Sequence, residues 1–196
     1  MRKRNILVVA VAAAAASLAT AVPASSHGWI TTPPSRAGLC AAGTVKNCGD
    51  IQWEPQSVEG PKGFPSSGPS DGTLCAGGNA RFAQLDDPRG GAWPARQVTA
   101  GQQLTFTWNF TARHATTQFR YYLTKAGYNA ATTRLTRSNL DLTPFLTVPY
   151  GGRQVPGSLS HTATLPSGRT GHQVVLAVWD IADTGNAFYQ CMDVTF

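Results

Sequence analysis

The sequence predicts an all-β fold, an antiparallel β-sandwich preceded by a long loop region. Residues 104–112 alternate strictly between apolar and polar side chains, as a strand with one buried face does. Further strand candidates lie at 118–125, 172–183 and 187–196, and neither an amphipathic helix nor an internal repeat separates them. Short strands joined by turns are typical of a sandwich.

Residues 1–26 are typical of a secretory signal peptide. A basic start precedes a long apolar run, and Ala24 and Ser26 occupy the −3 and −1 positions that a signal peptidase prefers. A membrane anchor is the alternative, but the run is rich in alanine and is broken by Pro23, which makes it a weak span. We therefore expect a secreted protein that is free of the membrane after cleavage, with residues 27–196 as a single domain.

The charge of the chain excludes one class of partner. Three of its 16 basic residues belong to the signal peptide, so cleavage leaves 13 against 10 acidic residues, a net charge of +3 instead of +6. No cluster of Lys and Arg that could follow a phosphate backbone is present. We expect no binding of nucleic acid, and a monomer.

The segment from residue 27 to about residue 96 is rich in Gly, Pro and Ser, which is the composition of loops. It is too long for a plain connection, so we expect a functional loop region, which short helices could interrupt, at one end of the sandwich. The pattern then becomes that of strands. Segment 172–183 is more continuously apolar than the others and is suited to burial. The buried face of the strand at 104–112 is expected to carry Leu104, Phe106, Trp108 and Phe110.

Four cysteines in an exported chain predict two disulfides. Three connectivities are possible. We favour Cys40–Cys48, which closes a short loop, and this leaves Cys75–Cys191 to tie an early loop to the last strand. A zinc site is the competing interpretation, but no two of the cysteines are separated by two residues, the spacing that is typical of such sites.

After cleavage His27 would be the first residue and would carry two nitrogen donors, its α-amine and its imidazole. The pKa of a free α-amine is about 8, so a metal ion displaces its proton readily. A third nitrogen from a second histidine would complete the planar set that Cu(II) prefers. His114, between two expected strands, is the candidate, whereas His161 and His172 lie in turn-rich surroundings and are interpreted as surface residues. On spacing alone, each histidine could equally be an ordinary polar residue, and His27 an arbitrary terminus.

Four blocks of sequence, in order, resemble the bacterial lytic polysaccharide monooxygenases of auxiliary activity family ten, the chitin-binding protein type. They are "HGWITTPPSRAGLC", "GDIQWEPQSVEGPKGFP", "TARHATTQFRYYLTK" and "AVWDIADTGNAFYQ", and His27 and His114 stand in the first and third. The resemblance covers essentially all of residues 27–196. It implies a fibronectin III/immunoglobulin-like sandwich with one copper ion on a flat face.

The resemblance also implies roles for the residues around the metal. His27, through its amine and Nδ1, and His114 match the histidine brace that holds copper. Phe188 matches the axial aromatic residue, and as a phenylalanine it offers no oxygen ligand. Ala112 matches the small residue on the other axial side, and Glu59 matches the acid that positions the oxygen co-substrate.

A second set of residues matches the polysaccharide-binding face of the family. Trp53 stands where related chains commonly carry an exposed tyrosine; it keeps the stacking surface and loses the hydroxyl. The residues alone leave Trp53 open between core and surface. Glu54, Thr111, Asp183 and Asn186 match positions that make polar contacts to the substrate.

The implied activity is that of a copper-dependent monooxygenase that cleaves glycosidic bonds of crystalline chitin at C1. It requires an external reductant and hydrogen peroxide or dioxygen. A cellulose-active member of the family and a non-catalytic chitin-binding module are the alternatives, and a secreted structural protein with a zinc site is a third. A hydrolase would need two suitably separated carboxylates, and nothing in the sequence pairs them.

Overall fold

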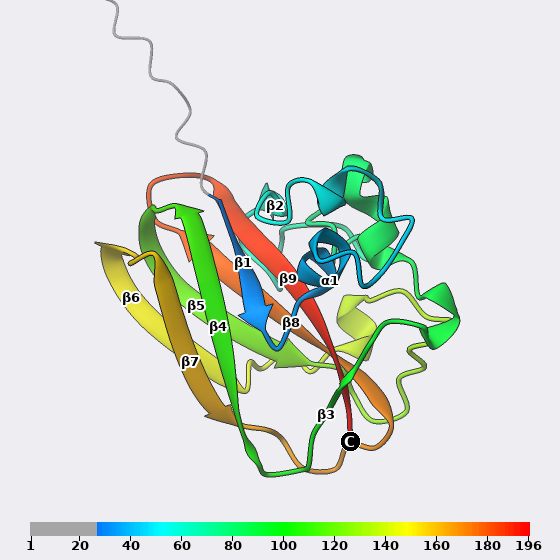
Figure 1. The fold of residues 1–196 in the computed structure, drawn as a ribbon. Helices are drawn as coiled ribbons and strands as arrows, with labels where there is room; N and C mark the ends of the chain where they lie inside the picture. The colour runs from blue at the N-terminus through cyan, green and yellow to red at the C-terminus, as the bar shows by residue number, and fades with distance from the viewer. Residues whose placement is uncertain (1–26) are drawn as a thin grey trace, which may run out of the picture.

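The structure, a computed structural model, describes residues 27–196; the expected signal peptide lies outside the described residues. Two sheets face each other as a sandwich (Figure 1). The first sheet has the order β1-β4-β7, and the second the order β2-β9-β8-β5-β6, with the short β3 beside β9. All pairings are antiparallel except that of β3 with β9. The all-β sandwich predicted from the sequence is confirmed.

The strands and helices of the described residues have the following bounds. The first sheet consists of β1 (His27–Thr32), β4 (Gln103–Ala112) and β7 (Ser158–Thr164). The second consists of β2 (Glu59–Pro61), β3 (Arg96–Gln97), β5 (Ala115–Leu123), β6 (Leu146–Gln154), β8 (His172–Ile181) and β9 (Asn186–Thr195). The helical segments are short: α1 (Arg36–Ala41) and the 3₁₀ turns η1 (Gly49–Gln52), η2 (Ala80–Asp86), η3 (Arg89–Gly91) and η4 (Arg137–Asn139). None of the helices in residues 27–196 is both long and apolar enough to cross a membrane.

The alternation in β4 sets the core between the sheets. Leu104, Phe106, Trp108 and Phe110 are buried, as the sequence predicts. On the opposite face of β4, hydroxyl groups form hydrogen bonds with hydroxyl groups of β7. Oγ1 of Thr105 and Oγ1 of Thr162, for example, are 2.8 Å apart. Strands β8 and β9 are buried on both faces because the loop region covers the outer side of the second sheet, where a second core forms. This accounts for the continuously apolar segment at 172–183.

The loop region is fastened to β9 by a disulfide and a buried ion pair. The structure contains both disulfides that the sequence favoured, Cys40–Cys48 and Cys75–Cys191. Arg36 donates through Nε to Oδ2 of Asp193 at 2.7 Å and through Nη2 to Oδ1 at 3.0 Å. Burial opposes the ionisation of Asp193, but the Arg36 guanidinium offsets this and keeps the pKa of the carboxyl below its usual value.

Two histidines are not the surface residues that the sequence suggested. The side chain of His161 is buried among aromatic rings, and its Nδ1 is hydrogen-bonded to the hydroxyl of Tyr121 at 2.7 Å. His172 is partly buried and contacts Asp193 through Nε2 at 2.7 Å. The turn-rich sequence around both residues was misleading because β7 and β8 place these positions against packed neighbours.

Candidate metal centre

The two histidines of the expected brace lie at the same end of the sandwich, because β1 pairs with β4. His27 begins β1 and lies opposite Ala112, and His114 follows Ala112 by two residues. Figure 1 shows that the start of β1, the end of β4, strand β2 and the connection between β8 and β9 lie at this same end. The hydrogen bond from the Ala182 amide to the Ala115 carbonyl, 2.8 Å, attaches that connection to the segment of His114.

His114 is held in one orientation by a carboxylate. Its side chain is 7% exposed, and its Nδ1 lies 3.3 Å from Oδ1 of Asp183. An ionised carboxylate only accepts hydrogen bonds, so the imidazole donates from Nδ1 and the lone pair remains on Nε2. A metal-binding histidine commonly has such a partner, which fixes its tautomer and raises the basicity of the other nitrogen.

The glycine after His27 is required by packing. A Cβ at Gly28 would lie 2.7 Å from Cδ1 of Phe110 and 3.1 Å from the ring of Trp179. Its amide donates to the carbonyl of Gln56 at 3.1 Å, which joins β1 to the loop region. The close packing of Gly28 therefore places the first residue of β1 next to the aromatic end of the core.

That aromatic end of the core contains Phe188. Its ring is fully buried and lies 4.9 Å from the ring of Trp179, which in turn contacts Phe110 at 4.7 Å. Phe188 pairs with Glu59 across β9 and β2. The carboxylate of Glu59 accepts a hydrogen bond from Nδ2 of Asn186 at 2.9 Å. The structure thus places Glu59, Asn186 and Phe188 together at this end.

The remaining predicted residues are exposed or partly buried. Trp53 follows η1 and is 81% exposed, so the structure places it on the surface and not in the core. Thr111 is exposed at the end of β4, where Ala112 is partly buried. Oε1 of Glu54 accepts a hydrogen bond from Nη2 of Arg81 at 2.5 Å.

Arg81 is a neighbour that the sequence did not identify. It also contacts Asp50 at 3.2 Å, and hydrogen bonds with Asp50 and Glu54 raise the pKa of its guanidinium. Arg81 lies in η2, roughly thirty residues after the carboxylates that it joins, so no local spacing in the sequence reveals the contact.

The donor set of this end of the molecule has a composition that suits copper. Within residues 27–196, no group of three or more His, Cys, Asp and Glu side chains is arranged to hold a metal ion. A three-nitrogen set here therefore needs the α-amine of His27 in addition to two imidazoles. Nitrogen donors of this kind suit Cu(II), whereas structural zinc takes a tetrahedral set of four ligands. The residues present fit copper.

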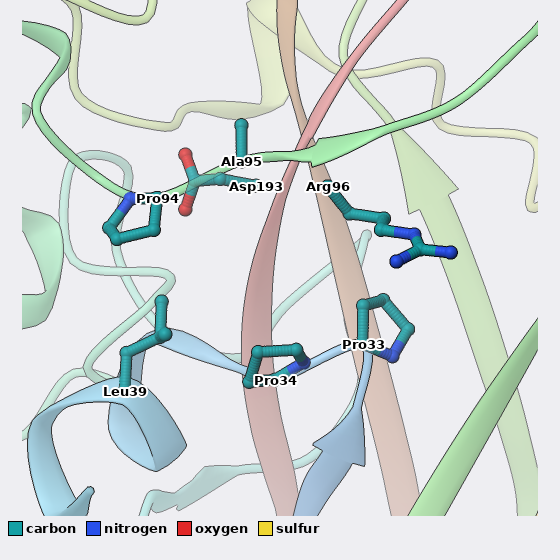
Figure 2. Close-up of a pocket in the computed structure, with 7 residues that line it drawn as sticks. All are labelled: Pro33, Pro34, Leu39, Pro94, Ala95, Arg96 and Asp193. Atoms are coloured by element: carbon teal, nitrogen blue, oxygen red, sulfur yellow. The ribbon is translucent and has the colours of Figure 1, made fainter. Parts of the chain in front are cut away.

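A pocket elsewhere on the molecule is separate from this end. Figure 2 shows Pro33 and Pro34 facing Arg96 across it, with the carboxylate of Asp193 at its edge. Asp193 lies seven residues beyond Asn186 in β9, which at ~3.3 Å per residue is roughly 20 Å from the histidine end. The pocket does not belong to the candidate metal centre.

Comparison with known proteins identifies similar chains over nearly the whole described length. The family described as lytic polysaccharide mono-oxygenase, cellulose-degrading, matches residues 27–194. A GlcNAc-binding protein A of Shewanella oneidensis is 42% identical over 98% of this chain, and the chain spans 40% of that relative.

Solved structures agree with this result. An AA10 lytic polysaccharide monooxygenase from Streptomyces lividans is 62% identical with a TM-score of 0.84, over 87% of this chain and 100% of that one. A Bacillus amyloliquefaciens CBM33 protein, determined in complex with Cu(I), is 37% identical with a TM-score of 0.78, over 86% of this chain and 99% of that one.

Proposed function

Because the chain belongs to the lytic polysaccharide monooxygenases of auxiliary activity family ten, we propose that residues 27–196 form one secreted, copper-dependent domain that oxidatively cleaves an insoluble polysaccharide. Cleavage of the signal peptide after Ser26 creates the α-amine that the metal site needs. The domain acts as a monomer and has no nucleic-acid partner.

The observation that carries the proposal is the placement of His114 beside Asp183 at the end of the sandwich where β1 begins. His27, through its amine and imidazole, and His114 would hold one copper ion. When bound, copper would supply the one-electron redox chemistry that hydroxylation of a carbon of the glycosidic bond requires, with an external reductant and hydrogen peroxide or dioxygen as the other reactants.

The protein's own groups prepare this site. Asp183 keeps the proton of His114 on Nδ1 and leaves Nε2 as the donor. Phe188 has no oxygen atom, so it would supply no ligand to the copper ion where a tyrosine could supply one, and the small side chain of Ala112 would leave space beside the site. Glu59, oriented by Asn186, provides a carboxylate to position the oxygen co-substrate.

We propose chitin as the substrate and C1 as the oxidised carbon. Trp53, which is 81% exposed, offers a ring on which the apolar face of a sugar can stack, and Glu54, Thr111, Asp183 and Asn186 supply polar groups. The name of the Shewanella relative supports an N-acetylglucosamine polymer. The description of the matching family favours cellulose instead, so cellulose is the second candidate.

The competing function is a non-catalytic chitin-binding module. It would use the same face and would have no need of a buried histidine oriented by a carboxylate. The contact of His114 with Asp183 therefore favours the enzyme.

The test is to incubate the copper-loaded domain beginning at His27 with β-chitin or cellulose, ascorbate and hydrogen peroxide. Mass spectrometry should detect aldonic-acid oligosaccharides from chitin. Oxidised products from cellulose alone would identify cellulose as the substrate. If neither polymer gave oxidised products, the proposed enzymatic activity would be refuted.

Two variants serve as controls for this test. His114→Ala should remain folded and lose the activity. A chain with one glycine added before His27 keeps every side chain and displaces only the α-amine, so it should also be inactive. Full activity of the extended chain would refute the role of the amine.

A further inference from the structure

Lys62, directly after β2, forms three hydrogen bonds with the last residue of β8 and the connection that follows it. Its Nζ donates to the carbonyl oxygen of Ile181 and to that of Thr184, the latter at 2.6 Å. Its backbone amide donates to the carbonyl of Gly185 at 2.9 Å. Within residues 27–196, no carboxylate lies within ion-pair distance of Lys62. The cation is therefore directed at backbone carbonyls.

The two carbonyls that Lys62 binds lie on either side of Asp183. The chain before them is anchored through Asp180, which accepts two hydrogen bonds of 3.0 Å from Arg120. The connection itself has the sequence Ala-Asp-Thr-Gly and lies between strands. Residues 182–185 thus lie outside both strands, and Lys62 bonds to this part of the chain through Thr184 and Gly185.

Asp183 depends on this backbone for its position. Its side chain is 52% exposed, and its partner among the described side chains is His114, at 3.3 Å. A half-exposed carboxylate gains little from one such contact, so the contact persists only where the backbone already presents the carboxylate to the ring.

We infer that Lys62 is a positioning residue for His114 and acts through Asp183. By bonding the carbonyls of Ile181 and Thr184, its ammonium fixes the backbone that presents the Asp183 carboxylate to Nδ1 of His114. Glu59 lies in β2, and Lys62 follows β2 directly. One short segment therefore supplies both the acid that pairs with Phe188 and the ammonium that bonds the backbone on either side of Asp183. The inference rests on the proposed metal site.

The first experiment removes the ammonium and keeps the length of the side chain. Lys62→Met leaves two carbonyls without their charged donor, so Cu(II) should bind about three- to tenfold more weakly, part of the 10–100-fold effect typical of losing an outer partner. The Cu(II) electron paramagnetic resonance spectrum should change as well. In the copper-free protein, the amides of Ala182 and Asn186 should exchange hydrogen faster.

Two variants control for general damage. Lys125 also donates to a backbone carbonyl, that of Ser138 at 2.9 Å, but belongs to another part of the fold, so Lys125→Met should leave all three measurements unchanged. Lys62→Arg retains a cationic donor and should restore Cu(II) affinity to within about twofold of the wild type.

A double-mutant cycle separates a positioning role from general destabilisation. If Lys62 acts through Asp183, Lys62→Met should have little further effect on Cu(II) affinity in an Asp183→Asn background. Additive effects, or equal affinity and spectra for Lys62→Met and the wild type, would overturn the inference. Failure of the wild-type domain itself to bind Cu(II) would instead overturn the proposed function.

Discussion

The two disulfides should differ strongly in their contribution to stability, because they close loops of very different length. Cys75–Cys191 spans 116 residues and Cys40–Cys48 spans 8. Restriction of the unfolded chain predicts a stabilisation of about 4.8 kcal/mol for the long loop and about 2.5 kcal/mol for the short one. All four cysteines are buried, so replacing either pair by alanine removes similar packing. The difference of about 2 kcal/mol therefore isolates the effect of loop length.

The assay is urea unfolding of the two double-alanine variants and of the wild type, followed by tryptophan fluorescence. The free energy of unfolding extrapolated to water is the quantity to compare, because a lost cross-link also changes the slope with denaturant. We expect the variant lacking Cys75–Cys191 to be the less stable one by about 2 kcal/mol. An equal loss for the two pairs, or a larger loss for Cys40–Cys48, would refute the argument.

Three further predictions concern single side chains. Trp53→Ala should leave the free energy of unfolding unchanged, because the ring is exposed, and weaken binding to chitin about two- to tenfold in a depletion assay. Asp193→Asn leaves the buried Arg36 without its counter-charge and should cost roughly 3–5 kcal/mol in urea unfolding. Burial lowers the pKa of His161 to about 4, from an ordinary value of 6.5. The unfolded chain then binds the proton more tightly, so the free energy of unfolding should rise between pH 4 and 6.5; His161→Gln should flatten that rise, and an unchanged slope would contradict the assignment.

The strands that the sequence predicted are those with a strong local pattern. The alternation at 104–112 and the apolar run at 172–183 each encode burial without reference to the rest of the chain. Strand β6 has only a short alternation, Leu146, Val148 and Tyr150, because it is an edge strand: Pro149 lacks an amide hydrogen, and Gly151 and Gly152 offer nothing to pack. Its existence depends on pairing with β5.

The candidate site was predictable only in its residue types. The resemblance named His27 and His114, but their common location follows from the register that sets His27 opposite Ala112. Trp53 was undecided between core and surface, since a single tryptophan fits either place. Arg81 and Lys62 gave no signal, because their partners lie far away in sequence.

The sequence by itself determined the sandwich class and the loop region before it, since these follow from side-chain periodicity and composition. For the cysteines it left three connectivities open, and the structure contains the favoured one. Only the tertiary structure decided that His161 is buried against Tyr121, that Asp183 contacts His114, and that Lys62 donates to the carbonyls of Ile181 and Thr184 on either side of Asp183. Periodicity is a property of neighbouring residues. Contacts such as these depend on strand register and on which connections meet at one end of the sandwich, and both are set by the packing of the whole chain.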